Sequence, residues 1–353
     1  MRKSLKIGGP ILAVSASLLL SGCGLGFGKE EASKQIDPPP ALSHKKETQP
    51  KSKATAASEK NKVKRQLYLF DSNGLVVPQM LPLPKSGMAA KQVLQYLVKD
   101  GPVTQMLPNG FQAVLPTDTR VLDVTVEKDG TAVANFSKEF KEYRAQDERK
   151  LLQAITFTLT QFEAIKTVKI QIEGHDQKDM PLQHTPIGEG VSRSDGINIE
   201  NGAVTNMAHS NTATLYFVAQ NSSNTTYYVP VTRRIAVNEN QDAVAAAVQE
   251  LIEGPTSESH LLSDVRNDVK LMNKPVVKDG VVTLNFNKAI LGNKAANMID
   301  DEVLKPLVLS LTEIEGVKKV AIQVDGKASL KNQAGKSLTA PVSRTEIVET
   351  GEF

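Results

Sequence analysis

The sequence predicts an α+β protein made of two small, similar domains in tandem, each with the order ββαββαβ and two helices packed on one sheet. Two observations support this fold class. Blocks of similar sequence recur in the same order at a spacing of about 150 residues, which is typical of a duplicated domain. Within each copy, segments that alternate apolar and polar residues, as strands do, are separated by segments with the three- and four-residue spacing of helices.

The repeated blocks align along most of both copies. "VEKDGTAVANFSK" (126–138) matches "VVKDGVVTLNFNK" (276–288), with Asp-Gly and Asn-Phe in register. "VKIQIEG" matches "VAIQVDG", "QLYLFD" matches "TLYFVA", and the tripeptide Val-Ser-Arg recurs at Val191 and Val342. We therefore predict one domain over residues 66–200 and a second over residues 201–350.

Each copy opens with two extended segments and a helix. Apolar residues alternate in the first segment, and a second extended piece follows at 75–77 or 227–230. The helix should end before a Gly-Pro pair, because glycine favours a helix C-terminus and proline cannot continue the helix. Its apolar positions are Ala90, Val93, Leu94 and Leu97 in the first copy and Val244, Ala247, Val248 and Leu251 in the second.

A hairpin, a second helix and a last strand complete each copy. The Asp-Gly pairs at 129–130 and 279–280 supply the positive φ of tight hairpin turns. The helix expected at 148–162 has a counterpart that contains Pro306, which predicts that this helix starts or kinks there. Last strands are expected at 168–172 and 320–324. In the first hairpin, alternation predicts an inner face of Leu122, Val124 and Val126 and an outer face of Val121, Asp123 and Thr125.

Residues 1–22 have the pattern of a secretory signal peptide. A basic start is followed by an apolar run of about ten residues, which is too short to cross a membrane as a helix. The chain's one cysteine, Cys23, comes next. Leu20-Ser21-Gly22-Cys23 resembles the lipobox of bacterial lipoproteins. That resemblance implies cleavage before Cys23, acylation of this residue, and a lipid anchor on the extracytoplasmic face of the cell membrane.

The composition of residues 23–65 predicts a disordered basic tether. This segment is rich in Lys, Ser, Ala, Glu and Pro and cannot bury enough apolar surface to offset the entropy lost on ordering. It carries ten basic against five acidic residues, whereas the whole chain has a net charge of only +3, so the domains are acidic. An acidic domain pair argues against nucleic acid as a partner.

The repeated motifs resemble the GerMN domain family. The resemblance rests on the "LYF" strand, the helix ending in Gly-Pro, the Asp-Gly hairpin followed by Asn-Phe, and the "VxIQ" strand. It implies a lipoprotein of sporulation and germination that lies between mother cell and forespore. The fold it implies is similar to the ring-building motif, which suggests assembly of a trans-envelope complex; this last step is an analogy of fold.

The sequence offers two candidates for chemistry, but we assign no catalytic, cofactor-binding or metal-binding residue. Asp300 and Asp301 could pair carboxylates for glycan hydrolysis, although acidic residues also favour helix N-termini. The other candidate is a loop whose spacing matches no standard zinc site, and which holds His175, Asp176, Asp179 and His184. We therefore expect no cofactor and no enzymatic activity.

The predicted function is that of a non-catalytic scaffold or assembly factor in an envelope complex. Its expected partners are the membrane, through Cys23, and proteins of the septal complex, with a second copy of the chain as a further candidate. Helix positions such as Lys91 and Glu250 are expected to be exposed to such partners. Two alternatives remain open: a lipoprotein that binds or remodels peptidoglycan, and a small-molecule receptor with its site between the domains.

Overall fold

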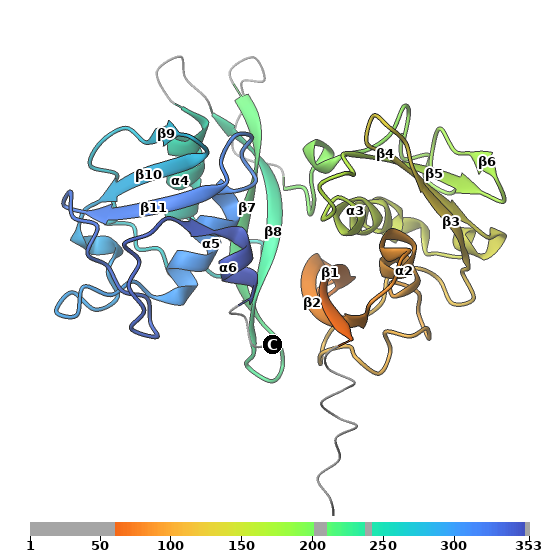
Figure 1. Cartoon of the computed structure of the whole chain (residues 1–353), viewed down its shortest axis with the longest axis horizontal. Coiled ribbons are helices and arrows are strands. Elements are labelled where there is room, and N and C mark those ends of the chain that lie inside the picture. Colours follow the sequence, from red (N-terminus) through yellow and green to blue (C-terminus); the bar gives the residue numbers. More distant parts are fainter. Residues whose placement is uncertain (1–60, 201–209, 237–241, 350–353) are drawn as a thin grey trace, which may run out of the picture. The chain divides into compact units, whose positions relative to one another are not determined.

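The computed structural model describes residues 61–200, 210–236 and 242–349 (Figure 1). All of these residues belong to one compact unit, Lys53–Phe353. The predicted signal peptide, Cys23 and most of the predicted tether lie outside the described residues. Among the residues that are described, no helix is both long enough and apolar enough to cross a membrane.

The order ββαββαβ is confirmed in both copies. The first copy consists of β1 (Lys62–Phe70), β2 (Val76–Pro84), α2 (Ala89–Gln95), β3 (Val121–Val126), β4 (Thr131–Phe136), α3 (Glu148–Leu159), β5 (Thr167–Ile172) and the short β6 (His175–Asp176). The second consists of β7 (Ser210–Gln220), β8 (Thr226–Ala236), α4 (Ala243–Glu253), β9 (Val276–Lys278), β10 (Val281–Phe286), α5 (Asp301–Leu311), β11 (Lys319–Val324), β12 (Val342–Ser343) and α6 (Arg344–Glu349).

Each copy divides its strands between two sheets, where the sequence predicts one. β1 and β2 form a two-stranded antiparallel sheet, and the other strands of the first copy follow the order β3-β4-β5-β6. The second copy has the pair β7-β8 and the sheet β12-β11-β10-β9. Helix α3 contacts both β1 and β5, and α5 contacts both β7 and β11 (Figure 1). Because one helix covers both sheets, their apolar faces are buried without the sheets pairing with each other.

The core of each copy is built around a parallel strand pair. β4 runs parallel to β5 with Phe136 opposite Ile172, and β10 runs parallel to β11 with Phe286 opposite Val324. Parallel strands need a long crossover, which α3 and α5 provide. Both phenylalanines are fully buried. The same register in both copies places the repeated Asn-Phe motif at the same point of each core.

The predicted faces of the first hairpin are partly wrong. Val121 is buried, whereas Val126, which was expected inside, is 41% exposed. A bulge between Val121 and Asp123 explains the burial of Val121, because an extra residue in a strand shifts the alternation of its side chains. Val126 is the last residue of β3 and lies next to the turn. The turn prediction holds at Gly130, which has a φ of 92°, and at Gly280, which has a φ of 77°.

Several element boundaries also differ from the prediction. β1 begins at Lys62, so the last residues of the predicted tether are strand. α2 ends at Gln95, earlier than expected, whereas α4 ends at Glu253, just before Gly254 as predicted; the φ of Gly254 is 85°. α5 begins at Asp301 with Pro306 inside it, so the expected start at this proline is wrong. The backbone bond from Leu304 N to Asp300 O closes the first turn ahead of the proline.

Candidate functional site

The loop with the candidate metal ligands closes onto a buried carboxylate. His175 and His184 are both exposed, and within the described ranges no group of three or more His, Cys, Asp or Glu residues is placed to hold a metal ion. Instead, the backbone N–H groups of Leu182, Gln183 and Thr185 donate to Glu148 on α3, at 2.8, 2.8 and 3.0 Å. The loop is therefore attached to the domain core by Glu148.

Glu148 is charged despite being only 1% exposed. Its burial raises the pKa of the carboxyl, but hydrogen bonds from the Tyr143 hydroxyl and from the loop amides outweigh the burial and lower the pKa to about 2. The Tyr143 hydroxyl lies 2.7 Å from Glu148 Oε2. Four donors on one carboxylate leave it no room to act on a substrate, so its role is structural.

The second candidate, the Asp300–Asp301 pair, lies at a helix N-terminus. Asp300 is the N-cap residue of α5 and Asp301 lies in its first turn, where a negative charge complements the helix dipole. Asp301 Oδ2 lies 3.1 Å from Lys305 Nζ. Of the two interpretations open from the sequence, the structural one fits this position.

The two helix positions expected to face partners are engaged within the protein. Lys91 Nζ donates to the Leu122 carbonyl at 2.6 Å. Glu250 Oε2 lies 3.3 Å from Arg233 Nη1, and the Glu250 side chain is only 20% exposed. The prediction that these are free surface positions is therefore wrong.

A cluster that the sequence did not predict joins the two copies. We call it the junction cluster; it consists of Tyr68, Arg193, Tyr216, Glu313 and Arg344. Arg193 donates to both carboxylate oxygens of Glu313, from Nε at 3.1 Å and from Nη2 at 2.8 Å. Arg344 Nη2 lies 2.8 Å from Glu313 Oε1, and the Tyr216 hydroxyl donates to the same oxygen at 3.0 Å. One carboxylate thus holds two guanidinium groups.

The tyrosines of the junction cluster occupy equivalent positions in the two copies. Tyr68 lies in β1 and its backbone N–H donates to Thr158 Oγ1 on α3 at 3.0 Å. Tyr216 lies in β7 and its N–H donates to Ser310 Oγ on α5 at 2.8 Å. The same contact between first strand and second helix therefore fixes both tyrosine rings.

The arginines of the junction cluster are the arginines of the repeated Val-Ser-Arg motif. A capping hydrogen bond shapes the turn at each: Ser192 N donates to Asp195 Oδ2 and Ser343 N donates to Glu346 Oε2, both at 2.7 Å. Arg193 Nη2 then lies 3.3 Å from the Tyr68 hydroxyl, and Arg344 Nη2 donates to the Tyr216 hydroxyl. Each copy thus contributes one Tyr-Arg pair.

The copies differ at the position of the carboxylate. Glu313 follows α5, and the equivalent residue after α3 is Gln161, which instead bonds to both backbone groups of Gln66, at 3.0 and 2.6 Å. Burial raises the pKa of Glu313, but the guanidinium groups of Arg344 and Arg193 outweigh it and lower the pKa to about 2. The junction therefore contains two partly buried positive charges and one negative charge.

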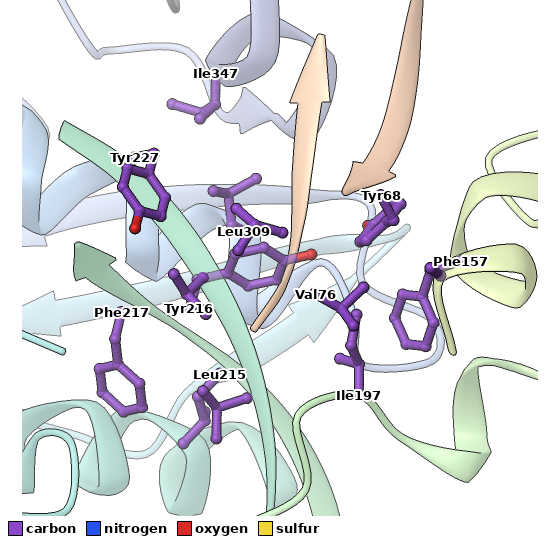
Figure 2. Packing of buried hydrophobic residues seen from close by; sticks show 14 of the residues in the cluster. Tyr68, Val76, Phe157, Ile197, Leu215, Tyr216, Phe217, Tyr227, Leu309 and Ile347 are labelled. Atoms are coloured by element: carbon purple, nitrogen blue, oxygen red, sulfur yellow. The ribbon is translucent and has the colours of Figure 1, made fainter. Parts of the chain in front are cut away.

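Further polar contacts connect the copies beside the junction cluster. The buried Asn198 amide accepts from Val76 N at 2.9 Å and donates to the carbonyls of Val76 and Pro230, both at 2.8 Å. The Tyr227 hydroxyl donates to Asp71 Oδ2 at 2.9 Å. Figure 2 shows apolar side chains of both copies, with Val76 and Tyr216 among them, in one buried cluster. The two domains thus share a continuous core.

The last residues that the sequence assigns to the first domain pair with the second. Thr232 N, in β8, donates to Ile197 O at 2.8 Å, and Glu200 N donates to Thr232 O at 3.0 Å. Two copies of one α+β unit, fused through a shared core and a charged junction, define a tandem GerMN-domain protein.

Comparison with known proteins establishes the family. A family model described as "Germane: Sporulation and spore germination" matches residues 66–178 and 214–330, so the chain belongs to this family. The chain is 47% identical, over 96% of its length and 96% of the relative's, to the spore germination protein GerM of Bacillus subtilis (strain 168). The solved structure of the tandem GerMN domains of that sporulation protein matches with a TM-score of 0.74 and 51% identity, covering 80% of this chain and 97% of that one.

Proposed function

We propose that this protein is a lipid-anchored, non-catalytic lipoprotein that acts as a scaffold or assembly factor of an envelope complex at the sporulation septum. Membership of the sporulation and germination family indicates the process in which the protein acts. The lipobox-like sequence before Cys23 supports an anchor on the extracytoplasmic face of the membrane, with residues 23–61 as the tether. The observation that carries the scaffold role is the fusion of two copies of one fold into a single body with unlike surfaces.

The unlike surfaces lie at the hairpins and the loops. β3 has six residues, whereas its counterpart β9 has three. β9 forms the edge of its sheet and carries the exposed Val276 and Val277, at 58% and 47%. The loop attached to Glu148 in the first copy is replaced in the second by a loop of different sequence at 327–339. Two similar domains with different sheet edges are suited to contact two different neighbours.

Peptidoglycan binding, the alternative from the sequence, has less support. Proteins that hold sugars usually present aromatic faces, but the exposed large apolar side chains of the described residues include no Phe or Tyr. Binding of the protein to isolated wall sacculi tests this alternative directly. Sedimentation of the protein with sacculi, at a level unaffected by removing other envelope proteins, would favour this alternative.

Crosslinking in sporulating cells of the native host tests the scaffold role. Val126 and Val276 hold the same position in the repeat, and both are exposed in the structure. Val126→Asp and Val276→Asp should each remove a different set of crosslinked proteins, and neither should change the melting temperature by more than a few degrees, because both side chains already contact water. If neither variant changes the crosslinked set, these edges do not hold the partners and the proposal loses its support.

A further inference from the structure

A pocket of about 450 Å³ opens beside the junction cluster, between residues of the two copies. This volume is within the range of small-molecule sites. The pocket is lined by polar groups from both copies, including Lys64, Thr160, Arg193, Thr312, Glu313 and Arg344. Lys64 is exposed, so it lies at the mouth, whereas the two arginine side chains are only 27% and 23% exposed.

The charges that line this pocket do not balance. Lys64, Arg193 and Arg344 are cationic, and Glu313 is the one carboxylate among the described residues that line it. The pKa of Arg344 is raised by its tyrosine and carboxylate neighbours against the effect of burial, so its guanidinium stays charged. Buried charges are normally paired. An excess of positive charge in a partly enclosed pocket therefore favours an anion.

The hydrogen bonds that the two arginines make with described residues also do not use all of their N–H donors. A guanidinium group has five N–H donors. Arg193 makes four hydrogen bonds, to Glu313 twice, to Tyr68 and to Thr160. Arg344 also makes four, to Leu309 O, Thr312, Tyr216 and Glu313. Within the described part of the chain, one N–H group on each arginine thus remains for a ligand.

The geometry points to a binding site for a small polar ligand that carries a carboxylate, held between Arg193 and Arg344 with Lys64 at the mouth. One remaining N–H on each of two arginines matches the two oxygens of a carboxylate. The two arginine N–H groups match a carboxylate more closely than a phosphate, which has more oxygens to satisfy. The hydroxyls of Thr160 and Thr312 also line the pocket; each already donates to a helix carbonyl and accepts from an arginine, so each can accept one more hydrogen bond from a donor group of the ligand. This site is independent of the scaffold proposal, because it requires neither the lipid anchor nor the exposed edges.

Isothermal titration of the purified full chain with succinate, at constant ionic strength, tests this site. Succinamide has nearly the same shape without charge, so it serves as the control ligand. We expect saturable binding of succinate and none of succinamide. Lys64→Gln should weaken succinate binding about fivefold, as the loss of one nearby charge at a solvated rim does. The matched control Lys128→Gln, at an exposed lysine of the β3–β4 turn, should leave the affinity unchanged.

Glu313→Gln should change the affinity for succinate in the opposite direction. Removing the internal carboxylate leaves both guanidinium groups to the ligand, so the variant should bind succinate more tightly. Equal heats for succinate and succinamide would overturn the assignment, as would binding of inorganic phosphate without binding of succinate. Because Lys64 is exposed and takes no part in the junction cluster, the Lys64→Gln result stands even if Glu313→Gln does not fold.

Discussion

In the junction cluster, the negative charge of Glu313 determines whether Arg193 and Arg344, which belong to different domains, stabilise or destabilise the fold. A buried ion pair contributes little over well-packed apolar residues, but removing one partner leaves an uncompensated charge. Removing the charge of Glu313 would leave two uncompensated charges here, because two guanidinium groups share the single carboxylate. Their mutual repulsion would then act directly across the domain junction.

Glu313→Gln should therefore lower the free energy of unfolding by about 3–5 kcal/mol. The measurement is urea unfolding monitored by tyrosine fluorescence, because Tyr68 and Tyr216, one from each copy, lie in the junction cluster. Glu315→Gln is the matched control: the residue is exposed, and its change should be within about 0.5 kcal/mol. A Glu313→Gln variant as stable as the control would mean that the cluster does not hold the domains together.

Glu148 should make the stability of the protein sensitive to acid. The folded-state pKa of Glu148 is about 2, below its ordinary value of 4.5. A lowered pKa contributes stability that is fully present above about pH 4.5 and is lost as the pH falls toward 2. The melting temperature should therefore fall over this window, and it should fall less in Glu148→Gln, which starts from a lower stability at pH 7. Parallel pH curves for the two proteins would contradict the proposed role of this carboxylate.

At the scale of the elements, the parallel strand pairs are the centres of the two domains. Phe136 and Phe286 are both fully buried, but Phe136 also stacks on Phe140, with ring centroids 4.5 Å apart. Phe136→Ala and Phe286→Ala should each lower the free energy of unfolding by about 3–5 kcal/mol through lost burial and a cavity. Hydrogen exchange should locate the loosened amides first in the mutated domain. Equal loosening of both domains by either change would contradict this, because it would show that the effect of the cavity spreads through the shared core.

The order and kind of the elements could be predicted because the periodic patterns are repeated, and each copy supports the interpretation of the other. The division into two sheets could not, because alternation identifies strands and not their neighbours. The burial of Val121 depends on a bulge that no local pattern reveals. The tyrosines and arginines of the junction cluster lie within motifs that recur in the sequence, but only the structure shows that they converge on Glu313.

At the scale of the whole molecule, anchoring and folding should be separable. We propose that Cys23, through its lipid, holds the protein at the membrane. Cys23→Ala should leave the melting temperature unchanged and move the protein to the soluble fraction. Ser21→Ala keeps a small residue before the cysteine and should remain membrane-bound. Recovery of Cys23→Ala in the detergent-extracted fraction after a high-salt wash would contradict the lipid anchor.

The unequal pair Gln161 and Glu313 restricts how this duplicated chain can evolve. Two copies of the first half would bring two carboxamides to two arginines, and two copies of the second half would bring two carboxylates. Neither composition gives the arrangement in which one acid bridges both cations. Recombination between the halves, which easily makes tandem repeats uniform, would therefore damage the junction. The junction as it stands therefore requires both halves of the chain.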